Sequence, residues 1–251
     1  MSEPTRSNVI MLQEAIARPG GAMASPCAAC PVRELSICSA LAPEELNSLT
    51  AILTNVELAP GDPLIDEGEP ADNVFNITQG TLKVYKLLPD GRRQITGFLF
   101  PGDFLGLVRS DVYVCSAEAV TEVSLCRFSR KKLDTVVAEY PKLETRLLQM
   151  TRTELAEVQD QILLLGRKTA KERVATFLLT LARRAEARGD EVNPVGVPMS
   201  RDDIGDFLGL TTETVSRTFT RLKQSGLIAQ EPDRRVLIRD QAAMEDIAGG
   251  I

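Results

Sequence analysis

The chain has 251 residues, a formal net charge of −6 and no histidine. This length allows two domains with their own cores, and the absence of histidine excludes Ser-His-Asp and Cys-His catalysis, histidine haem ligation and mixed Cys/His zinc sites. Nothing resembles a signal peptide and no apolar run reaches roughly 18 residues, so we expect a cytoplasmic protein with no membrane partner, whose five cysteines stay reduced or bind metal.

The first predicted unit, residues 1–40, is a leader with a short helix near residues 9–17, followed by a cysteine loop. In the loop, Cys27 and Cys30 form a C-x2-C pair that brings two thiolates to one metal-sized locus, and Cys38 can close a loop around it. Soft thiolates select zinc, Cu(I) or iron–sulfur clusters. A redox-active C-x2-C is the alternative, but the βαβ context it expects does not follow. A closed site needs a fourth ligand, which only the two remaining cysteines offer: Cys115 and Cys126.

The second unit, residues 41–140, is predicted to be an antiparallel β-roll. An amphipathic helix over residues 43–54 opens it, and Gly- and Pro-rich turns recur at regular spacing through residues 56–128. Between the turns lie segments rich in β-branched and aromatic residues, which is typical of a barrel or jelly roll. The predicted strands are 74–78, 81–88, 94–100 and 112–128, and a short helix over 130–139 follows.

A long helix over residues 141–166 is predicted next, because Pro141 suits the first turn of a helix. Apolar positions then recur at alternating steps of three and four, which is the spacing of a dimerisation seam. The alternative is packing against the chain's own β-roll, and we favour a parallel homodimer. The seam residues are Leu148, Thr151, Leu155, Val158, Ile162 and Leu165.

The last unit, residues 167–251, is predicted to be a winged helix-turn-helix domain. After a helix over 167–188, Ser200 caps a short helix that Gly209 ends, and Thr211 or Thr212 caps a second helix. Val215, Phe219 and Leu222 form the buried face of that second helix. Two short strands, 227–229 and 236–238, form the wing.

The outward face of this second helix is the candidate DNA-reading surface. Arginine suits the paired acceptors of guanine and glutamate accepts from cytosine N4, so Arg217 and Glu213 can read a G·C-containing step. The alternative is an ordinary surface ion pair between the two, worth a few tenths of a kcal/mol. Although the whole chain is acidic, basic residues gather in and after this helix. The candidate DNA-binding residues are Thr212, Glu213, Ser216, Arg217, Thr220 and Arg221.

The order of cysteine cluster, β-roll, seam helix and winged helix-turn-helix resembles the CRP/FNR superfamily of bacterial transcription regulators, an α+β fold. The likeness covers nearly the whole chain from Cys27 and is sharpest at residues 94–98, 160–165 and 203–217. The chain looks like the FNR branch, which regulates anaerobic or microaerobic genes in response to oxygen. Its C-x2-C-x7-C spacing is similar to the FnrL/FnrN group.

This resemblance implies a [4Fe-4S] cluster on three N-terminal cysteines and one cysteine of the β-roll. Cys126 stands just before the strand end that leads into a short helix, as the family's fourth ligand does, whereas Cys115 is expected to be a small core residue. The resemblance also implies that Glu213, Ser216 and Arg217 read TTGAT, and that a dimer recognises TTGAT-N4-ATCAA. The hairpin over residues 90–99 is similar to a surface that contacts RNA polymerase.

The mechanism that the resemblance implies is an oxygen switch. The cluster orders the N-terminal loop and favours the dimer, and oxygen degrades the cluster and abolishes DNA binding. Some members make dimerisation conditional through an acidic seam residue, but Val158 stands at that place here. The chief alternative is a regulator of the same fold whose cysteines bind zinc or act as thiol sensors. A cyclic-nucleotide regulator is disfavoured because Cys115-Ser116 replaces the Arg-Ser pair that would hold the phosphate.

Overall fold

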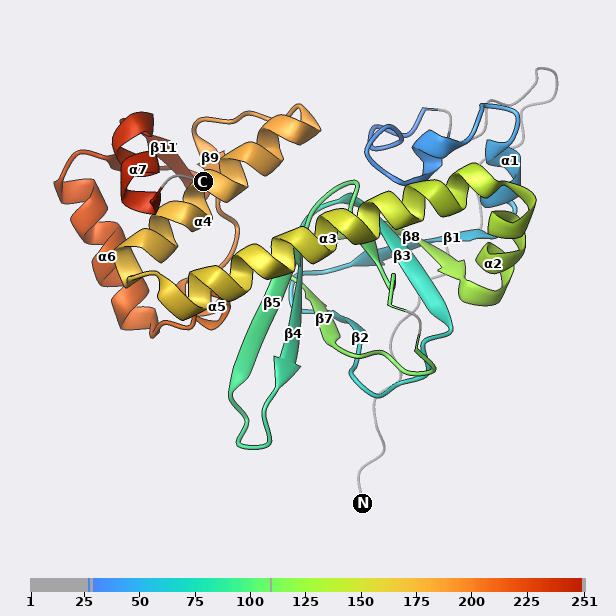
Figure 1. The fold of residues 1–251 in the computed structure, drawn as a ribbon, viewed down its shortest axis with the longest axis horizontal. Coiled ribbons are helices and arrows are strands. Elements are labelled where there is room, and N and C mark those ends of the chain that lie inside the picture. The colour runs from blue at the N-terminus through green and yellow to red at the C-terminus, as the bar shows by residue number, and fades with distance from the viewer. Residues whose placement is uncertain (1–26, 28, 109, 250–251) are drawn as a thin grey trace.

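The computed structural model describes residues 27, 29–108 and 110–249 and has an α+β architecture. A β-roll lies beneath one long helix, α3 (Pro141–Arg167), which runs across the molecule from the cysteine loop to the C-terminal domain (Figure 1). The predicted fold class is confirmed: a β-roll, a long helix and a C-terminal helix-turn-helix domain follow one another. None of the described helices is both long and apolar enough to cross a membrane.

The β-roll consists of two four-stranded antiparallel sheets with strand orders β1-β8-β3-β6 and β2-β7-β4-β5. Between them lies an apolar core that includes Ile77, Leu82 and Leu125. Gly80 makes the turn between β3 and β4 at φ 85°, and an added Cβ would lie 2.0 Å from the carbonyl oxygen of Glu122, so only glycine fits there. The strands are β1 (Leu53–Leu58), β2 (Pro63–Ile65), β3 (Asn73–Gln79), β4 (Leu82–Leu87), β5 (Arg93–Leu99), β6 (Phe104–Leu105), β7 (Ser116–Ala119) and β8 (Val123–Ser129).

In the N-terminal unit and the β-roll, β1, β2 and β6 were not among the predicted strands, and two predicted elements have other bounds. The expected helix over 43–54 is confined to α1 (Leu46–Thr50), because the chain from Leu53 pairs with β8. The expected strand over 112–128 is two strands, since the chain turns at residues 120–122 between β7 and β8. A 3-10 helix, η1 (Ile37–Ala40), carries the last cysteine of the N-terminal loop. The helix expected near residues 9–17 lies outside the described residues.

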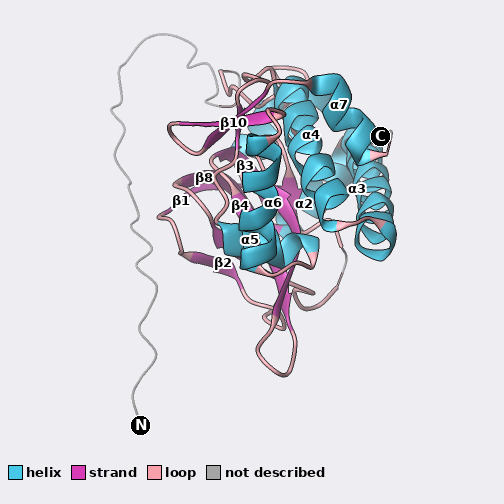
Figure 2. Cartoon of the chain, turned by 90° about the vertical axis from the view of Figure 1, so that its left-hand side faces the viewer, coloured by secondary structure: helices cyan, strands magenta, loops and turns pink. Residues whose placement is uncertain are grey.

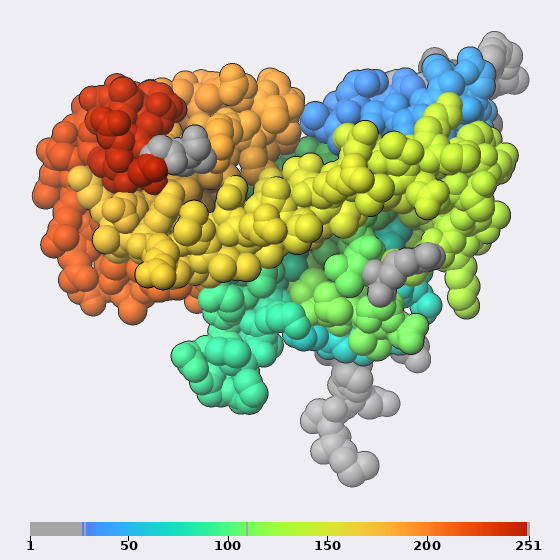
Figure 3. Space-filling model, in the orientation of Figure 1, coloured from blue at the N-terminus to red at the C-terminus, as the bar shows by residue number. Residues whose placement is uncertain are grey.

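The helices that follow were predicted closely. Helix α2 (Arg130–Glu139) matches its predicted range, and Pro141 lies in the first turn of α3. Helix α4 (Ala170–Arg188) begins three residues later than predicted, because Thr169 caps it and Glu172 completes a capping box. Figure 3 shows α3, in yellow and yellow-green, lying uncovered across one face of the molecule.

The C-terminal domain has the predicted helix-turn-helix and wing, with two additions (Figure 2). A two-residue strand joins the wing as its third strand, and a last helix packs against α4 with Met244 buried. Neither was predicted, because two residues show no periodicity and the last helix is short. The elements are β9 (Val195–Gly196), α5 (Arg201–Leu208), α6 (Thr212–Gln224), β10 (Ile228–Glu231), β11 (Arg235–Ile238) and α7 (Gln241–Ala248).

The core of the C-terminal domain continues into the β-roll. Ile95, Phe98 and Phe100 belong to the same apolar cluster as the buried residues of α4, α5 and α6. Phe98 of β5 lies with its ring centroid 5.2 Å from that of Phe207 of α5 and 6.3 Å from that of Phe177 of α4. The roll and the C-terminal domain are therefore joined by apolar packing.

Candidate cysteine centre and DNA-reading surface

The N-terminal cysteine loop is folded against α3. Ser36 caps η1 by accepting a hydrogen bond from the backbone N–H of Cys38 at 3.2 Å. Arg146 of α3 donates to the carbonyl oxygens of Leu35 at 2.6 Å and Ser36 at 3.3 Å. The position of this loop is thus tied directly to α3.

The three cysteines of the loop lie near Cys126 of β8. Burial, followed by the thiols of Cys38, Cys27 and Cys30, raises the pKa of Cys126 to about 12. Burial likewise raises the pKa of Cys38 to about 11, with contributions from Cys27 and Cys30. Without a bound metal these two groups are therefore neutral thiols at pH 7, and metal binding would have to release their protons.

Cys115 lies elsewhere in the roll. It is half-buried and packs against the core between the two sheets, whereas it was predicted to be a small residue of that core. Burial raises the pKa of its thiol, and the charges that act on it belong to Lys86, Glu67 and Glu154 rather than to any cysteine. Of the two candidates for a fourth ligand, Cys126 is the one beside the loop.

The donor set around the loop is made of sulfur and suits an iron–sulfur cluster or zinc. Cys27 and Cys38 belong to an apolar cluster that contains Phe104 and Phe128, and Cys126 packs against it. Thr50 donates a hydrogen bond to the sulfur of Cys27 at 3.3 Å. In the part of the chain that the structure describes, no three acidic or cysteine side chains are close enough together to hold a single metal ion. The cysteines are therefore neighbours, but their sulfur atoms do not surround a common position for a single metal ion.

Local hydrogen bonds fix the helix-turn-helix. The Ser200 hydroxyl accepts from the backbone N–H of Asp203 at 3.0 Å, and the Asp203 carboxylate accepts from the backbone N–H of Ser200 at 3.1 Å. Gly209 ends α5 in the left-handed region at φ 61°, and Thr211 caps α6. Ser200 and Gly209 thus have their predicted roles, and of the two candidate caps for the second helix, Thr211 is the one that caps it.

The predicted DNA-reading residues are all exposed and share one side of α6. Helix α6 itself lies at one end of the molecule (Figure 1). Arg217 and Glu213 form the surface pair that was the alternative, with Nη1 and Oε1 3.3 Å apart. Because both side chains are more than half exposed, the pair is weak and leaves both groups able to contact DNA. The hydroxyl of Thr212 instead donates to Asp202 of α5, so this residue also braces the turn.

The apolar side chains of the predicted seam are largely exposed along α3. Ile162 is 67% exposed and Leu155 is 58% exposed, which is unusual for large apolar residues on a helix. Leu163, which was not predicted, is exposed beside them. Leu165 is half-buried and packs against the C-terminal core, so it also serves the chain's own fold.

Comparison with known proteins identifies the family. Residues 55–140 match the cyclic nucleotide-binding domain and residues 172–247 match the Crp-like helix-turn-helix domain. The chain belongs to the Crp/FNR family of transcription regulators. Members are DNA-binding regulators rather than enzymes.

Three relatives show how this Crp/FNR-family chain compares along its length. The transcriptional activatory protein AadR of Rhodopseudomonas palustris is 43% identical, over 81% of this chain and 85% of its own. The transcriptional activator protein FnrL of Cereibacter sphaeroides is 36% identical, over 89% of this chain and 92% of its own length. The structure of FixK2 from Bradyrhizobium japonicum matches with a TM-score of 0.73 and 38% identity, over 78% of this chain and 97% of that one. Since Crp/FNR-family members do not all bind a cluster, the signal has to be argued from this chain's own residues.

Proposed function

We propose that this Crp/FNR-family regulator is an oxygen sensor that holds a [4Fe-4S] cluster on Cys27, Cys30, Cys38 and Cys126. The observation that carries the proposal is the place of Cys126 beside three cysteines at least 88 residues away in sequence, while Cys115 lies apart from them. A purely structural cysteine needs no such neighbours. When bound, the cluster supplies an oxygen-labile group of iron and sulfide held by thiolates.

The residues around the loop provide a route from that site to the dimer seam. Arg146 binds two loop carbonyl oxygens from α3, and Lys142, one turn earlier, pairs with Glu45 at 2.6 Å. A loop held in place by cysteine ligation would keep the Arg146 contacts, and a released loop would lose them. The apolar stripe of α3 then pairs with that of a second copy and forms the proposed homodimer.

The DNA-reading part of the proposal follows from α6. Arg217 would contact the guanine of TTGAT, Glu213 the cytosine paired with it, and Ser216 a neighbouring thymine or phosphate. Two copies would bind TTGAT-N4-ATCAA more tightly than either alone, because the second contact becomes intramolecular. The β4–β5 hairpin, which projects from the body in Figure 1, is the proposed contact for RNA polymerase.

The experiment that tests the cofactor is metal and sulfide analysis of protein purified without oxygen, together with its visible absorption. We expect iron and acid-labile sulfide in equal amounts, about four of each per chain, and a brown protein. Zinc in place of iron, or a colourless metal-free protein, would contradict the proposal and favour the zinc or thiol alternative.

A further inference from the structure

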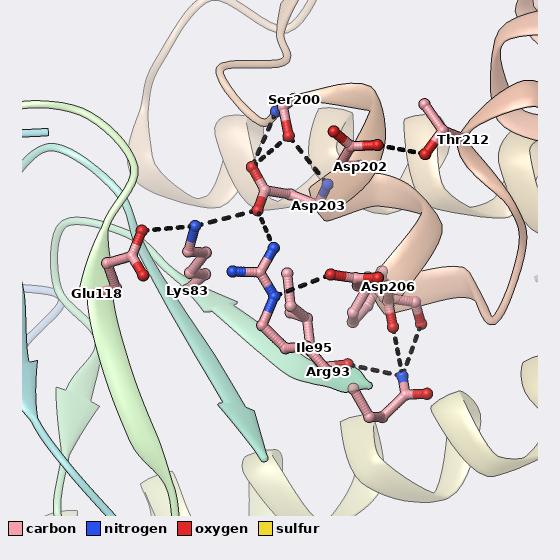
Figure 4. Close-up of polar contacts among 11 residues, drawn as sticks. Lys83, Arg93, Ile95, Glu118, Ser200, Asp202, Asp203, Asp206 and Thr212 are labelled. Carbon is pink, nitrogen blue, oxygen red and sulfur yellow. Dashed lines mark hydrogen bonds and ion pairs between the residues drawn. The ribbon is translucent and has the colours of Figure 1, made fainter. Parts of the chain in front are cut away.

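The contact between the β-roll and α5 contains a buried charge cluster that the proposed function does not use (Figure 4). Lys83 of β4 is only 7% exposed and Asp203 of α5 only 6%. The Lys83 ammonium lies 3.1 Å from an Asp203 oxygen and 2.7 Å from an oxygen of Glu118 in the roll. Arg93 of β5 reaches the same Asp203 oxygen at 3.1 Å.

Both oxygens of the Asp203 carboxylate have partners, and the Asp206 carboxylate pairs with the same arginine. Arg93 also binds Asp206 at 2.8 Å through its Nε. The second Asp203 oxygen accepts from the backbone and hydroxyl of Ser200. Buried charges are costly unless they are paired and hydrogen-bonded, so this set tolerates little displacement of α5.

The C-terminal end of α5 is also bound through its backbone carbonyl groups. Gln94 of β5 donates its amide to the carbonyl oxygen of Asp206 at 2.7 Å, and Gln161 of the seam helix donates to that of Phe207 at 2.8 Å. Helix α5 is therefore hydrogen-bonded both to the roll and to α3. The rings of Phe98, Phe177 and Phe207 pack beside these contacts. Apolar packing alone is non-directional, whereas ion pairs and amide hydrogen bonds fix a register.

Any constraint on α5 is passed to the reading helix. A Cβ on Gly205 of α5 would lie 2.6 Å from the carbonyl oxygen of Leu210 in the turn, so the turn packs directly on α5. Thr212 at the start of α6 hydrogen-bonds Asp202 of α5. Helices α5 and α6 thus form one rigid unit.

We propose that Lys83, Arg93 and Gln94 are positioning residues for DNA recognition: they fix the reading helix in one orientation on the roll and thereby set the spacing at which a dimer reads two half-sites. The proposal rests on the proposed palindrome-binding dimer. Charged contacts add orientation specificity here, in addition to whatever they add to stability.

The test measures binding of the full-length protein, purified without oxygen, to duplexes with three, four or five base pairs between TTGAT and ATCAA. We expect the wild type to prefer one spacing. Arg93→Glu should reduce that preference on the order of tenfold, while affinity for a duplex with one half-site stays unchanged. The charge swap Arg93→Glu/Asp206→Arg should restore the preference.

Lys86→Met is the matched control, because Lys86 lies on the same strand as Lys83 but pairs with Glu67 within the roll. It should keep the wild-type preference. Three outcomes would overturn the inference and leave the proposed function standing. They are an unchanged spacing preference in Arg93→Glu, a charge swap that fails to restore the preference, and an equal fall in affinity for the single half-site. A wild type that binds none of the duplexes would overturn the proposed function and the inference with it.

Discussion

Cys126 and Cys115 are both half-buried cysteines of the β-roll, but only Cys126 has other cysteines as neighbours. We therefore expect Cys126→Ala to lose the cluster, seen as loss of iron and of visible absorption in protein purified without oxygen. Cys115→Ala is the control and should keep both. A Cys126→Ala protein with a full complement of iron would show that the ligand set is wrong.

Arg217 is the residue on which base discrimination is expected to depend. Arg217→Ala should weaken binding to the TTGAT palindrome by about 1–3 kcal/mol per half-site and remove the preference for guanine over adenine at its third position. Fluorescence anisotropy with the two duplexes measures both effects. Lys223→Ala, an exposed cation on the same helix, should weaken both duplexes alike. Retained guanine preference in Arg217→Ala would assign the reading to another side chain.

At the scale of elements, the exposed stripe of α3 makes a prediction about assembly. Leu155→Glu should weaken the free energy of dimerisation by several kcal/mol, because it places two charges in an apolar seam. The fold of each chain should stay intact, since the position is exposed. Ala156→Glu adds the same charge about 100° around the helix and is the control. Analytical ultracentrifugation of both proteins without oxygen distinguishes them. If Leu155→Glu and Ala156→Glu dimerise with equal affinity, the interface lies elsewhere than on the exposed stripe of α3.

The elements that could be predicted from sequence are those with local signals. The caps at Ser200 and Thr211, the glycine at 209 and the periodic apolar face of α6 fix the helix-turn-helix within a short stretch of chain. The end of α1 and the strand β9 depend on pairing with distant strands, so no local pattern reveals them. The choice of Cys126 came from family resemblance, since spacing alone left Cys115 open.

At the scale of the whole molecule, the contact between roll and DNA-binding domain was not predictable. Arg93 and Asp203 are 110 residues apart, and each alone reads as an ordinary surface charge or helix cap. Only the three-dimensional structure shows that they meet with Lys83 in a buried cluster.

That cluster has a stability consequence. Lys83→Met should lower the free energy of unfolding by about 3 kcal/mol at neutral pH, because it leaves carboxylates without their buried partner. Burial alone raises the pKa of Asp203, but hydrogen bonds from Ser200 and Lys83 and the charge of Lys83 bring it below its ordinary value of 3.8. Its contribution is therefore present above that value and is lost as the pH falls through the folded-state pKa. Chemical unfolding should show that the free energies of unfolding of the wild type and of Lys83→Met converge in acid. A difference between them that grows as the pH falls would contradict the assignment.

The oxygen switch is the central claim and links the cysteines, α3 and α6. Its most direct test follows one sample, purified without oxygen, by visible absorption and by anisotropy with a TTGAT-N4-ATCAA duplex, before and after air is admitted. We predict a broad band near ~400 nm that changes on aeration, with palindrome binding lost in step. Undiminished binding after the band has changed, or tight binding by a colourless protein, would contradict it.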